Sequence, residues 1–198
     1  MSKLSSVPIE LKNHKQWVLW KNITRDGKPT KVPFQPSGIP ASSTGPETWS
    51  SFKSVAESLE GYAGAGFVFT ENDCFIGIDL DGCIDPKTKA MEQWAKDVVL
   101  QMGAYAEVSP SGTGVKIFGT ADVRWPHRKK IELPYAAVCD KQPAIEVYDH
   151  GRFFAVTGRR LKDMIDVMPV DLYFDWLADS YGMRQVVHVV DGAGVKLE

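Results

Sequence analysis

Short apolar runs, separated by polar, glycine or proline residues, predict a series of β-strands. Residues 17–34 mix aromatic and basic side chains around Asp26-Gly27, which is typical of a β-hairpin. The other predicted strands are rich in Phe, Ile and Val and cover residues 66–70, 74–81, 105–108, 115–118, 144–148 and 152–157. Between three and six turn-forming residues separate the members of each consecutive pair, so we expect three further hairpins.

Apolar side chains at three- and four-residue spacing predict helices over about residues 46–59, 86–103 and 170–181. The first begins with a capping-box pattern, in which Thr44 is followed by Glu47. The second has one apolar stripe, formed by Met91, Trp94, Ala95, Val98, Val99 and Met102. The Gly-rich residues 185–198 indicate a tail or linker. This order of elements predicts an α+β domain with a mainly antiparallel sheet that helices cover on one face.

The composition is that of an ordinary folded domain. The chain has 198 residues, of which 43% are hydrophobic and 24% charged, and this excludes a disordered tail, a collagen-like rod and a disulfide-rich mini-protein. No apolar stretch approaches the roughly 18 residues that span a bilayer, and the first residues lack the apolar core of a signal peptide, so we expect a cytoplasmic protein. The three cysteines have no metal-ligand spacing and predict reduced thiols.

The net charge of -2 gives no overall attraction to nucleic acid, so such binding would need local basic patches. Two segments are candidates: residues 124–130, where Trp125 lies among basic residues, and the set Arg152, Arg159, Arg160 and Lys162. Basic and aromatic residues together suit single-stranded nucleic acid, although an exposed charged loop is the commoner explanation. The four histidines are scattered and form neither a metal-binding pair nor a hydrolase triad.

Two carboxylates lie on one face of a predicted strand. In residues 75–81 the alternation of a strand places Ile78 and Leu80 on one face, and Asp79 and Asp81 on the other. Neighbouring carboxylates repel one another, and a divalent cation such as Mg²⁺ or Mn²⁺ would neutralise them. The alternative is a solvated strand end.

A third strand-borne acid is Glu146, which lies between Ile145 and Val147. Taken alone, it is better explained by a cross-strand ion pair with Lys116 or Arg152. Three acids that are all presented by strands favour a metal site.

The loop over residues 109–114 is rich in Ser, Thr and Gly, and Lys116 follows it. Its backbone N–H groups and hydroxyls could contact phosphate oxygens, with the lysine as a further cation. The spacing does not match the P-loop of ATPases, and a strand rather than a helix follows. A hairpin loop without a binding role is the alternative.

Taken in order, three motifs resemble one family. They are Asp79-Leu80-Asp81, the segment from Glu107 to Lys116, and the segment from Glu146 to Gly158. The chain resembles the N-terminal primase-polymerase domain of phage and plasmid replication proteins, within the archaeo-eukaryotic primase superfamily. That superfamily has an Asp-x-Asp pair, a Ser-x-His element and a lone acid in this order. Residues 31–34 and 43–49 also resemble its N-terminal module.

The resemblance implies an RRM-like, mainly antiparallel catalytic sheet with covering helices, plus a small N-terminal α/β module. The catalytic core would cover residues 1–184, with the N-terminal module over about 1–65, the RRM-like module over about 66–184, and the active cleft between them. Residues 185–198 would be the tail.

The resemblance also assigns site residues. Asp79, Asp81 and Glu146 would bind Mg²⁺ or Mn²⁺ for template-directed nucleotidyl transfer, the chemistry of a DNA polymerase or primase. The nucleotide phosphates would contact Ser109, Ser111, Gly112, Thr113, Gly114, Lys116 and Arg152. Lys116 stands where most superfamily members have histidine, which leaves the triphosphate geometry and the metal preference open.

The expected partners are a single-stranded DNA template, a primer and (d)NTPs, together with a downstream helicase or helical domain, in the replication of a phage, plasmid or other mobile element. Because the Gly-rich end looks like a cut linker, we expect the chain to extend primers but to start few strands de novo. The main alternative function is a catalytically inactive RRM-like module that binds single-stranded nucleic acid. A strand-nicking initiator is disfavoured because the chain has no His-x-His pair.

Overall fold

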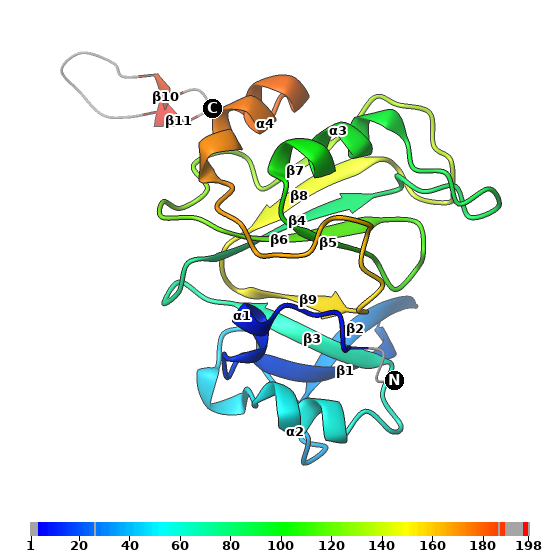
Figure 1. The fold of residues 1–198 in the computed structure, drawn as a ribbon, viewed down its shortest axis with the longest axis vertical. Helices are drawn as coiled ribbons and strands as arrows, with labels where there is room; N and C mark the ends of the chain where they lie inside the picture. The colour runs from blue at the N-terminus through cyan, green and yellow to red at the C-terminus, as the bar shows by residue number, and fades with distance from the viewer. Residues whose placement is uncertain (1–3, 26, 186, 189–195, 198) are drawn as a thin grey trace.

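The computed structural model describes residues 4–25, 27–185, 187–188 and 196–197, and its main body contains two antiparallel sheets (Figure 1). The four-stranded sheet has the order β2-β1-β3-β9, from β1 (Trp17–Arg25), β2 (Lys28–Phe34), β3 (Gly64–Phe69) and β9 (Arg152–Val156). The five-stranded sheet has the order β5-β6-β4-β8-β7, from β4 (Phe75–Asp81), β5 (Tyr105–Val108), β6 (Val115–Thr120), β7 (Lys130–Glu132) and β8 (Ala144–Tyr148). The mixed α/β class with antiparallel sheets is as predicted, and the RRM-like character of the larger sheet stays a prediction.

Helices α3 (Gln93–Met102) and α4 (Phe174–Tyr181) cover one face of the five-stranded sheet (Figure 1). The predicted stripe of α3 is confirmed, since five of its six members are buried: Trp94, Ala95, Val98, Val99 and Met102. The helix ends at Gly103, whose φ of 58° is the left-handed conformation that glycine adopts without strain. It starts at Gln93 and not near residue 86 as predicted, because Met91 forms an antiparallel bridge with Ile84 and the N–H of Glu92 donates to the carbonyl of Cys83, which keeps the chain extended up to Glu92. A short 3₁₀ turn, η2 (Asp171–Tyr173), precedes α4.

The single helix predicted over residues 46–59 is wrong. The structure has a 3₁₀ turn, η1 (Pro46–Thr48), and then the separate helix α2 (Phe52–Glu57). Ser50 exchanges two backbone hydrogen bonds with Trp17, at 2.8 and 3.0 Å, and this bridge interrupts the helix. Ser51 caps α2 by accepting the N–H of Ser54, so the predicted cap residue Thr44 does not have that role. The short helix α1 (Ile9–Lys12) and α2 pack on the four-stranded sheet.

Two of the predicted hairpins are not hairpins, because the chain changes sheets at their turns. β3 lies in the four-stranded sheet and β4 in the five-stranded sheet, and β8 and β9 are divided in the same way. Instead of pairing with its sequence neighbour, β9 pairs with β3, with Phe67 opposite Phe154. The side chain of Arg124 holds both crossing turns, because it donates to the carbonyls of Asp149 and Glu71. The four-stranded sheet therefore takes β9 from the range 66–184, so the predicted boundary near residue 65 does not separate the two sheets.

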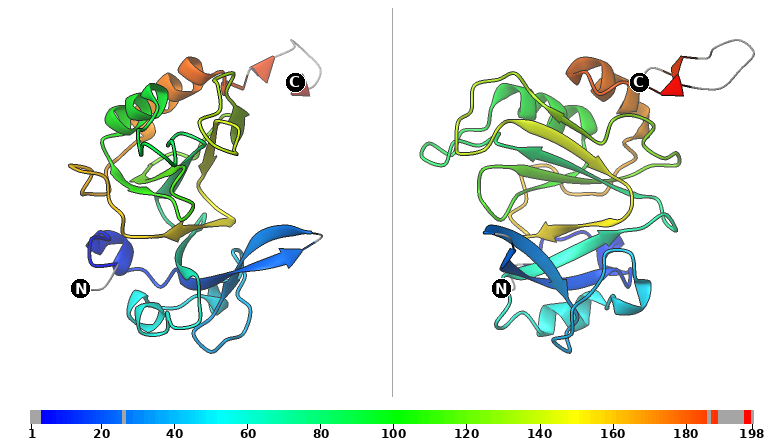
Figure 2. Two further views of the ribbon diagram at one scale, coloured as in Figure 1. Left: turned by 90° about the vertical axis from the view of Figure 1, so that its right-hand side faces the viewer. Right: turned by 180° about the vertical axis from the view of Figure 1, so that it is seen from behind.

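The other two hairpins are confirmed. β1 and β2 pair from Leu19–Phe34 to Arg25–Lys28 and project from the body of the molecule (Figure 2), and Asp26 of their predicted turn lies outside the described residues. β5 and β6 pair as predicted. Of the predicted tail, the two-residue strands β10 (Val187–His188) and β11 (Lys196–Leu197) pair with each other, and residues 186, 189–195 and 198 lie outside the described residues. No helix in the described part of the chain is long and apolar enough to cross a membrane.

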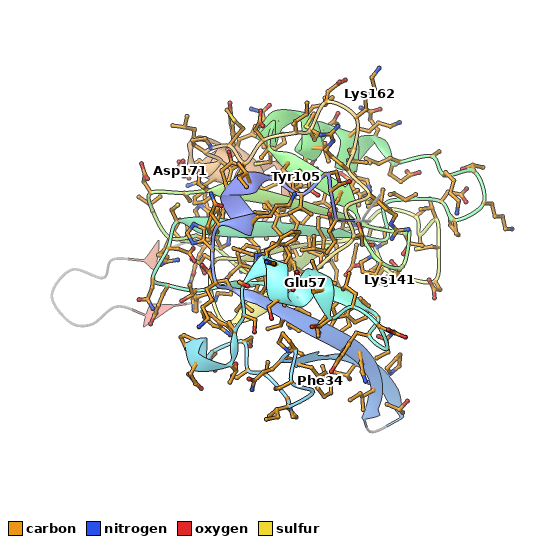
Figure 3. The ribbon with its side chains drawn as sticks, turned by 60° about the horizontal axis from the view of Figure 1, so that its bottom comes forward. Phe34, Glu57, Tyr105, Lys141, Lys162 and Asp171 are labelled. Atoms are coloured by element: carbon orange, nitrogen blue, oxygen red, sulfur yellow. The ribbon has the colours of Figure 1, made fainter. Side chains whose placement is uncertain are left out.

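An aromatic cluster joins the two sheets. Phe67, Phe69 and Phe154 of the four-stranded sheet pack with Tyr105 and Phe118 of the five-stranded sheet, and all five are buried. Figure 3 shows Tyr105 among the side chains in the middle of the molecule. The same face of the five-stranded sheet carries the predicted acids, so one face serves both for packing and for the candidate site.

Candidate active site

A row of charged side chains crosses the five-stranded sheet. In the antiparallel register, Glu107 is opposite Lys116, Lys116 is opposite Asp79, Asp79 is opposite Glu146, and Glu146 is opposite Lys130. Directly opposite residues of an antiparallel pair lie on one face with their Cβ atoms about 5 Å apart. All five therefore lie on one face, away from α3 and α4, and pairing across β4 and β8 brings two of the predicted acids together.

Asp79 is nearly buried, and only one of its two carboxylate oxygens has a partner. The Nζ of Lys116 bonds Oδ2, whereas Oδ1 is buried and makes no hydrogen bond. The Lys116 ammonium also lies 4.1 Å from the ring centre of Phe154, which holds it in place. Burial raises the pKa of Asp79; the charge of Lys116 opposes this, and those of Asp81 and Glu146 add to it.

Glu146 is held by two donors. Its Oε1 is 2.9 Å from the Nζ of Lys130, and its Oε2 accepts a hydrogen bond of 2.8 Å from the hydroxyl of Tyr148. Burial alone would raise the pKa of Glu146, but the hydrogen bonds from Lys130 and Tyr148 outweigh it and the pKa is lowered. Glu146 is therefore more readily ionised than its neighbour Asp79, whose pKa is raised.

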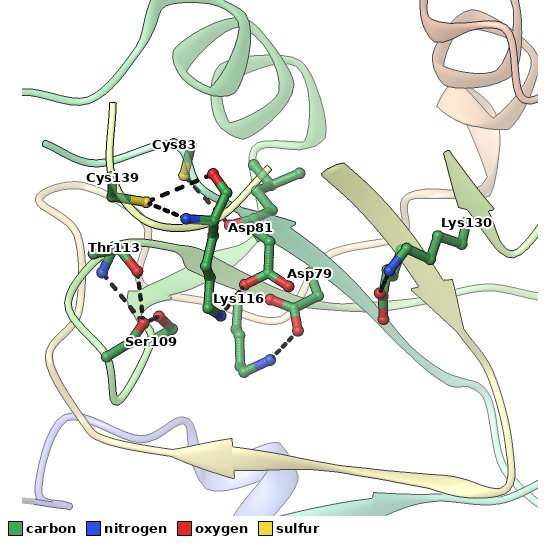
Figure 4. A network of polar contacts seen from close by, with 12 residues as sticks. Asp79, Asp81, Cys83, Ser109, Thr113, Lys116, Lys130 and Cys139 are labelled. Atoms are coloured by element: carbon green, nitrogen blue, oxygen red, sulfur yellow. Dashed lines mark hydrogen bonds and ion pairs between the residues drawn. The ribbon is translucent and has the colours of Figure 1, made fainter. Parts of the chain in front are cut away.

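Asp81 lies at the end of β4 and is paired with a lysine from the loop before β8. The Nζ of Lys141 is 2.7 Å from Oδ1 of Asp81. Burial would lower the pKa of Lys141, but its hydrogen bond to Asp81 and the charges of Asp81 and Asp79 raise it. Figure 4 shows Asp79 and Asp81 side by side, with Lys116 beside Asp79. Each of the three predicted acids thus has its own lysine.

The Ser/Gly loop between β5 and β6 lies next to Asp81, as the site prediction requires. Gly114 is so close to β4 that a Cβ there would be 2.6 Å from the carbonyl oxygen of Leu80 and 3.6 Å from the Cα of Asp81. Within the loop the hydroxyl of Ser111 lies 3.0 Å from that of Ser109 and 2.9 Å from that of Thr113. Gly112 has a φ of +80°, which suits glycine at the tip of the turn.

A cleft of about 460 Å³ opens in front of Asp79, and both sheets line it. Asp79 and Lys116 come from the five-stranded sheet, and Lys31 and Arg152 come from the four-stranded sheet. Arg152 was predicted on the opposite arm of a hairpin, but it reaches the cleft from β9 of the other sheet, where its guanidinium lies 4.9 Å from the ring centre of Tyr148. Partial burial, followed by the positive charges of Lys116 and Lys141, lowers the pKa of Lys31.

Sequence reasoning did not assign Lys31, Lys130 or Lys141 to the site of the acids, although Lys130 belongs to the candidate basic segment 124–130 and Lys31 to the segment 31–34. Each comes from a strand or loop whose local pattern is ordinary, and only the tertiary fold brings it to the acids. Conversely, Trp125 of the basic segment 124–130 is buried and donates its Nε1–H to the carbonyl of Arg128, so it cannot stack on a base in this conformation.

Glu107, part of the second motif, makes contacts that stabilise the fold. Its carboxylate is fully buried and accepts the backbone N–H groups of Thr157 and Gly158, at 2.7 and 2.9 Å, and the hydroxyl of Tyr105, at 2.8 Å. Glu107 thereby fastens the end of β9 to the five-stranded sheet. Burial raises the pKa of this carboxyl.

The chemistry of the predicted ligand set suits a hard divalent cation, since its donors are carboxylate oxygens and one of them, Oδ1 of Asp79, is buried without a partner. With the side chains as they stand, the described residues contain no group of three or more His, Cys, Asp or Glu side chains that could hold a metal ion. Lysine ammonium groups lie against the carboxylates instead. Mg²⁺ or Mn²⁺ binding by Asp79, Asp81 and Glu146 therefore remains a prediction.

Comparison with known proteins supports the resemblance. A DNA primase-polymerase of Nitratiruptor phage NrS-1 is 35% identical to this chain over 167 residues, which cover 82% of the chain. The match spans only 22% of the length of that curated relative. No protein-family model matches the chain.

Proposed function

Since this chain is a relative of the phage primase-polymerases, we propose that it is the catalytic core of a nucleotidyltransferase that adds nucleotides to a primer on a DNA template. The biological setting would be the replication of a phage, plasmid or other mobile element. The observation that carries the proposal is the pairing of Asp79 with Glu146 across β4 and β8, with Asp79 at the wall of a cleft that both sheets line.

The charges of the cleft suit a polyanionic substrate. The cleft wall carries one acid, Asp79, and three basic side chains, Lys31, Lys116 and Arg152. Glu146 and Asp81 lie beside Asp79 on the sheet, paired with Lys130 and Lys141. A surplus of positive charge in a partly buried cleft attracts the triphosphate of a nucleotide and the backbone of nucleic acid. A cluster of partly buried charged groups beside a cleft is typical of a functional site.

We assign the predicted roles to residues on this basis. Asp79, Asp81 and Glu146 would hold Mg²⁺ or Mn²⁺, which when bound would activate the primer 3′-hydroxyl and neutralise the triphosphate. The hydroxyl would lose its proton to water, its oxygen would bond to the α-phosphorus, the bond from that phosphorus to the bridging oxygen would break, and pyrophosphate would leave. Lys116 fixes the orientation of Asp79 and adds positive charge at the cleft wall. Tyr148 holds Glu146 in place through Oε2.

The nucleotide phosphates would lie between the loop 109–114, which adjoins Asp81, and Arg152 in the wall of the cleft. The loop offers the hydroxyls of Ser109, Ser111 and Thr113, which at present bond one another, and the backbone of Gly112 and Gly114. Arg152 approaches from β9 and would neutralise a phosphate of the nucleotide or the template. The single-stranded template and the primer would then enter along the open side of the cleft.

Primer extension tests the proposal. Asp79→Asn and Glu146→Gln keep side-chain volume and remove charge, so we expect each to lower nucleotide incorporation by at least about 100-fold. Asp97→Asn on α3 and Glu132→Gln on β7 are matched controls on exposed acids and should retain parental activity. Folding is checked by thermal melting, and binding of single-stranded DNA by fluorescence anisotropy.

Two results would speak against this assignment. Near-parental incorporation by Asp79→Asn or Glu146→Gln would refute the role of these acids. A parent chain that binds single-stranded DNA but incorporates no nucleotide with either metal would instead support the inactive binding module.

A further inference from the structure

We propose that Lys130 and Lys141 are exchangeable counter-ions, which hold the acids while the site is free of nucleotide and move to the nucleotide's phosphates when it binds. This inference rests on the proposed function and adds to it that metal and nucleotide bind cooperatively. The proposal is based on three lysine–carboxylate ion pairs, one for each predicted acid.

The three pairs differ in how far their lysines can move. The side chain of Lys116 is only 8% exposed and its ammonium lies against Phe154, so it is fixed on Asp79. The side chains of Lys130 and Lys141 are 52% and 41% exposed. A half-exposed lysine can leave its carboxylate and be solvated more readily than a buried one, because water already screens part of the pair.

A cation and a lysine compete for the same carboxylate oxygens. Oε1 of Glu146 bonds Lys130, and Oδ1 of Asp81 bonds Lys141. A divalent cation that arrives alone must displace both ammonium groups and then remain close to them, and the like charges repel. The metal alone should therefore bind weakly.

A nucleotide changes this balance because its phosphates provide new partners for the displaced lysines. Lys141 pairs with Asp81, beside Gly114 of the Ser/Gly loop, where the phosphates are proposed to lie. Once the lysines bond phosphate oxygens, the carboxylates are free to bind the cation. The negative charge of the phosphates then offsets the repulsion between the cation and the ammonium groups. Metal and nucleotide then each strengthen the binding of the other.

The test is a pair of binding measurements with opposite expected signs. Binding of Mn²⁺ alone to the full chain is followed by the electron paramagnetic resonance signal of free Mn²⁺. Lys130→Gln and Lys141→Gln should each tighten Mn²⁺ binding by about two- to fivefold, and the double variant by about tenfold. Binding of a dATP analogue with an NH bridge between the α- and β-phosphates, measured with Mn²⁺ present, should weaken in the same variants.

Matched variants separate this role from a general effect of charge or folding. Lys129→Gln removes an exposed lysine next to Lys130 and should change neither measurement. Lys141→Arg keeps the positive charge, so Mn²⁺ alone should bind as weakly as to the parent. A lysine with a merely structural role would not move the two affinities in opposite directions.

The outcomes also distinguish the inference from the function on which it rests. If Asp79→Asn abolishes Mn²⁺ binding but both lysine variants bind Mn²⁺ alone no more tightly than the parent, the exchange is refuted and the metal site stands. If Asp79→Asn leaves Mn²⁺ affinity unchanged, the metal assignment is wrong and the exchange falls with it.

Discussion

Gly77 sets how closely the two sheets approach each other, and its replacement by alanine tests this contact. A Cβ at position 77 would lie 2.5 Å from Cζ of Phe69 and within 3 Å of the ring of Phe154. Neither ring can easily give way, because both are buried and they pack edge to face, with their centres 4.9 Å apart. A side chain of any size at this position must push β3 and β9 away from β4 or force the rings out of their rotamers.

The size of the effect follows from overpacking. Extra methyl groups in a well-packed core typically cost about 1 to 3 kcal/mol, and we expect Gly77→Ala to lie in the upper half of that range because two aromatic rings are affected. For a domain of this size each kcal/mol lowers Tm by about 2 to 4 °C, so the expected loss is roughly 4 to 12 °C. Gly64→Ala is a milder control, since a Cβ at position 64 would lie 3.1 Å from Nε1 of Trp20, its nearest neighbour, and a smaller shift of that side chain would accommodate it.

Thermal and urea unfolding measure the prediction, with a second substitution as an internal test. Phe154→Leu removes the ring edge that a methyl group at 77 would meet, so the double variant should be more stable than the sum of the two single effects implies. If Gly77→Ala is as stable as the parent, or if the two effects simply add, then the aromatic contact does not fix the spacing of the sheets.

Two further predictions concern buried ionisable groups. Burial raises the pKa of the Glu107 carboxyl above its ordinary value of 4.5, so the folded state keeps the carboxyl proton at pH values where the unfolded state has lost it. The stability that this protonated group contributes is therefore fully present below pH 4.5 and is lost as pH rises through the raised pKa. Glu107→Gln places an amide N–H₂ against the donor at Gly158 and should cost about 1 to 3 kcal/mol, with a difference from the parent that narrows as pH rises in urea titrations between pH 4.5 and 8. Burial raises the pKa of the Cys83 thiol to about 12, so alkylation by iodoacetamide, followed by mass spectrometry, should modify the exposed Cys74 first and reach Cys83 only on unfolding. Equal rates at the two thiols in the folded protein would contradict the buried environment.

Local sequence patterns predicted those parts of the fold that local interactions determine. The stripe of α3 could be identified because its buried residues recur with the helical period, and Gly103 marks its end. The alternation in residues 75–81 placed Asp79 and Asp81 on one strand face for the same reason. Pairing over long sequence distances could not be predicted in this way, and β9 pairs with β3 of the other sheet and not with its sequence neighbour β8.

The lysine partners illustrate why a site is harder to predict than an element. Lys130 begins a three-residue strand, and Lys141 lies in an irregular loop, so neither has a pattern that connects it to Asp81 or Glu146. Only the register of β7 on β8 places Lys130 opposite Glu146. The carboxylates could be singled out because acids aligned on one strand face repel one another and therefore indicate a neutralising cation. A single lysine on a surface is common and indicates no particular partner.

Strand β4 shows how packing and chemistry depend on each other in this fold. One face of the strand carries Gly77, Asp79 and Asp81 in succession, so within five residues it changes from a contact with aromatic rings to a row of acids. Strand β9 of the other sheet likewise has one residue at the aromatic contact and one at the cleft. Phe154 lies against Gly77, and Arg152 lines the cleft. A shift of β9 that relieves a methyl group at position 77 would therefore also move Arg152 relative to Asp79. The close approach of the sheets at the glycine is thus what fixes the width of the cleft at the acids, and a variant that loosens the first should change nucleotide affinity before the chain unfolds.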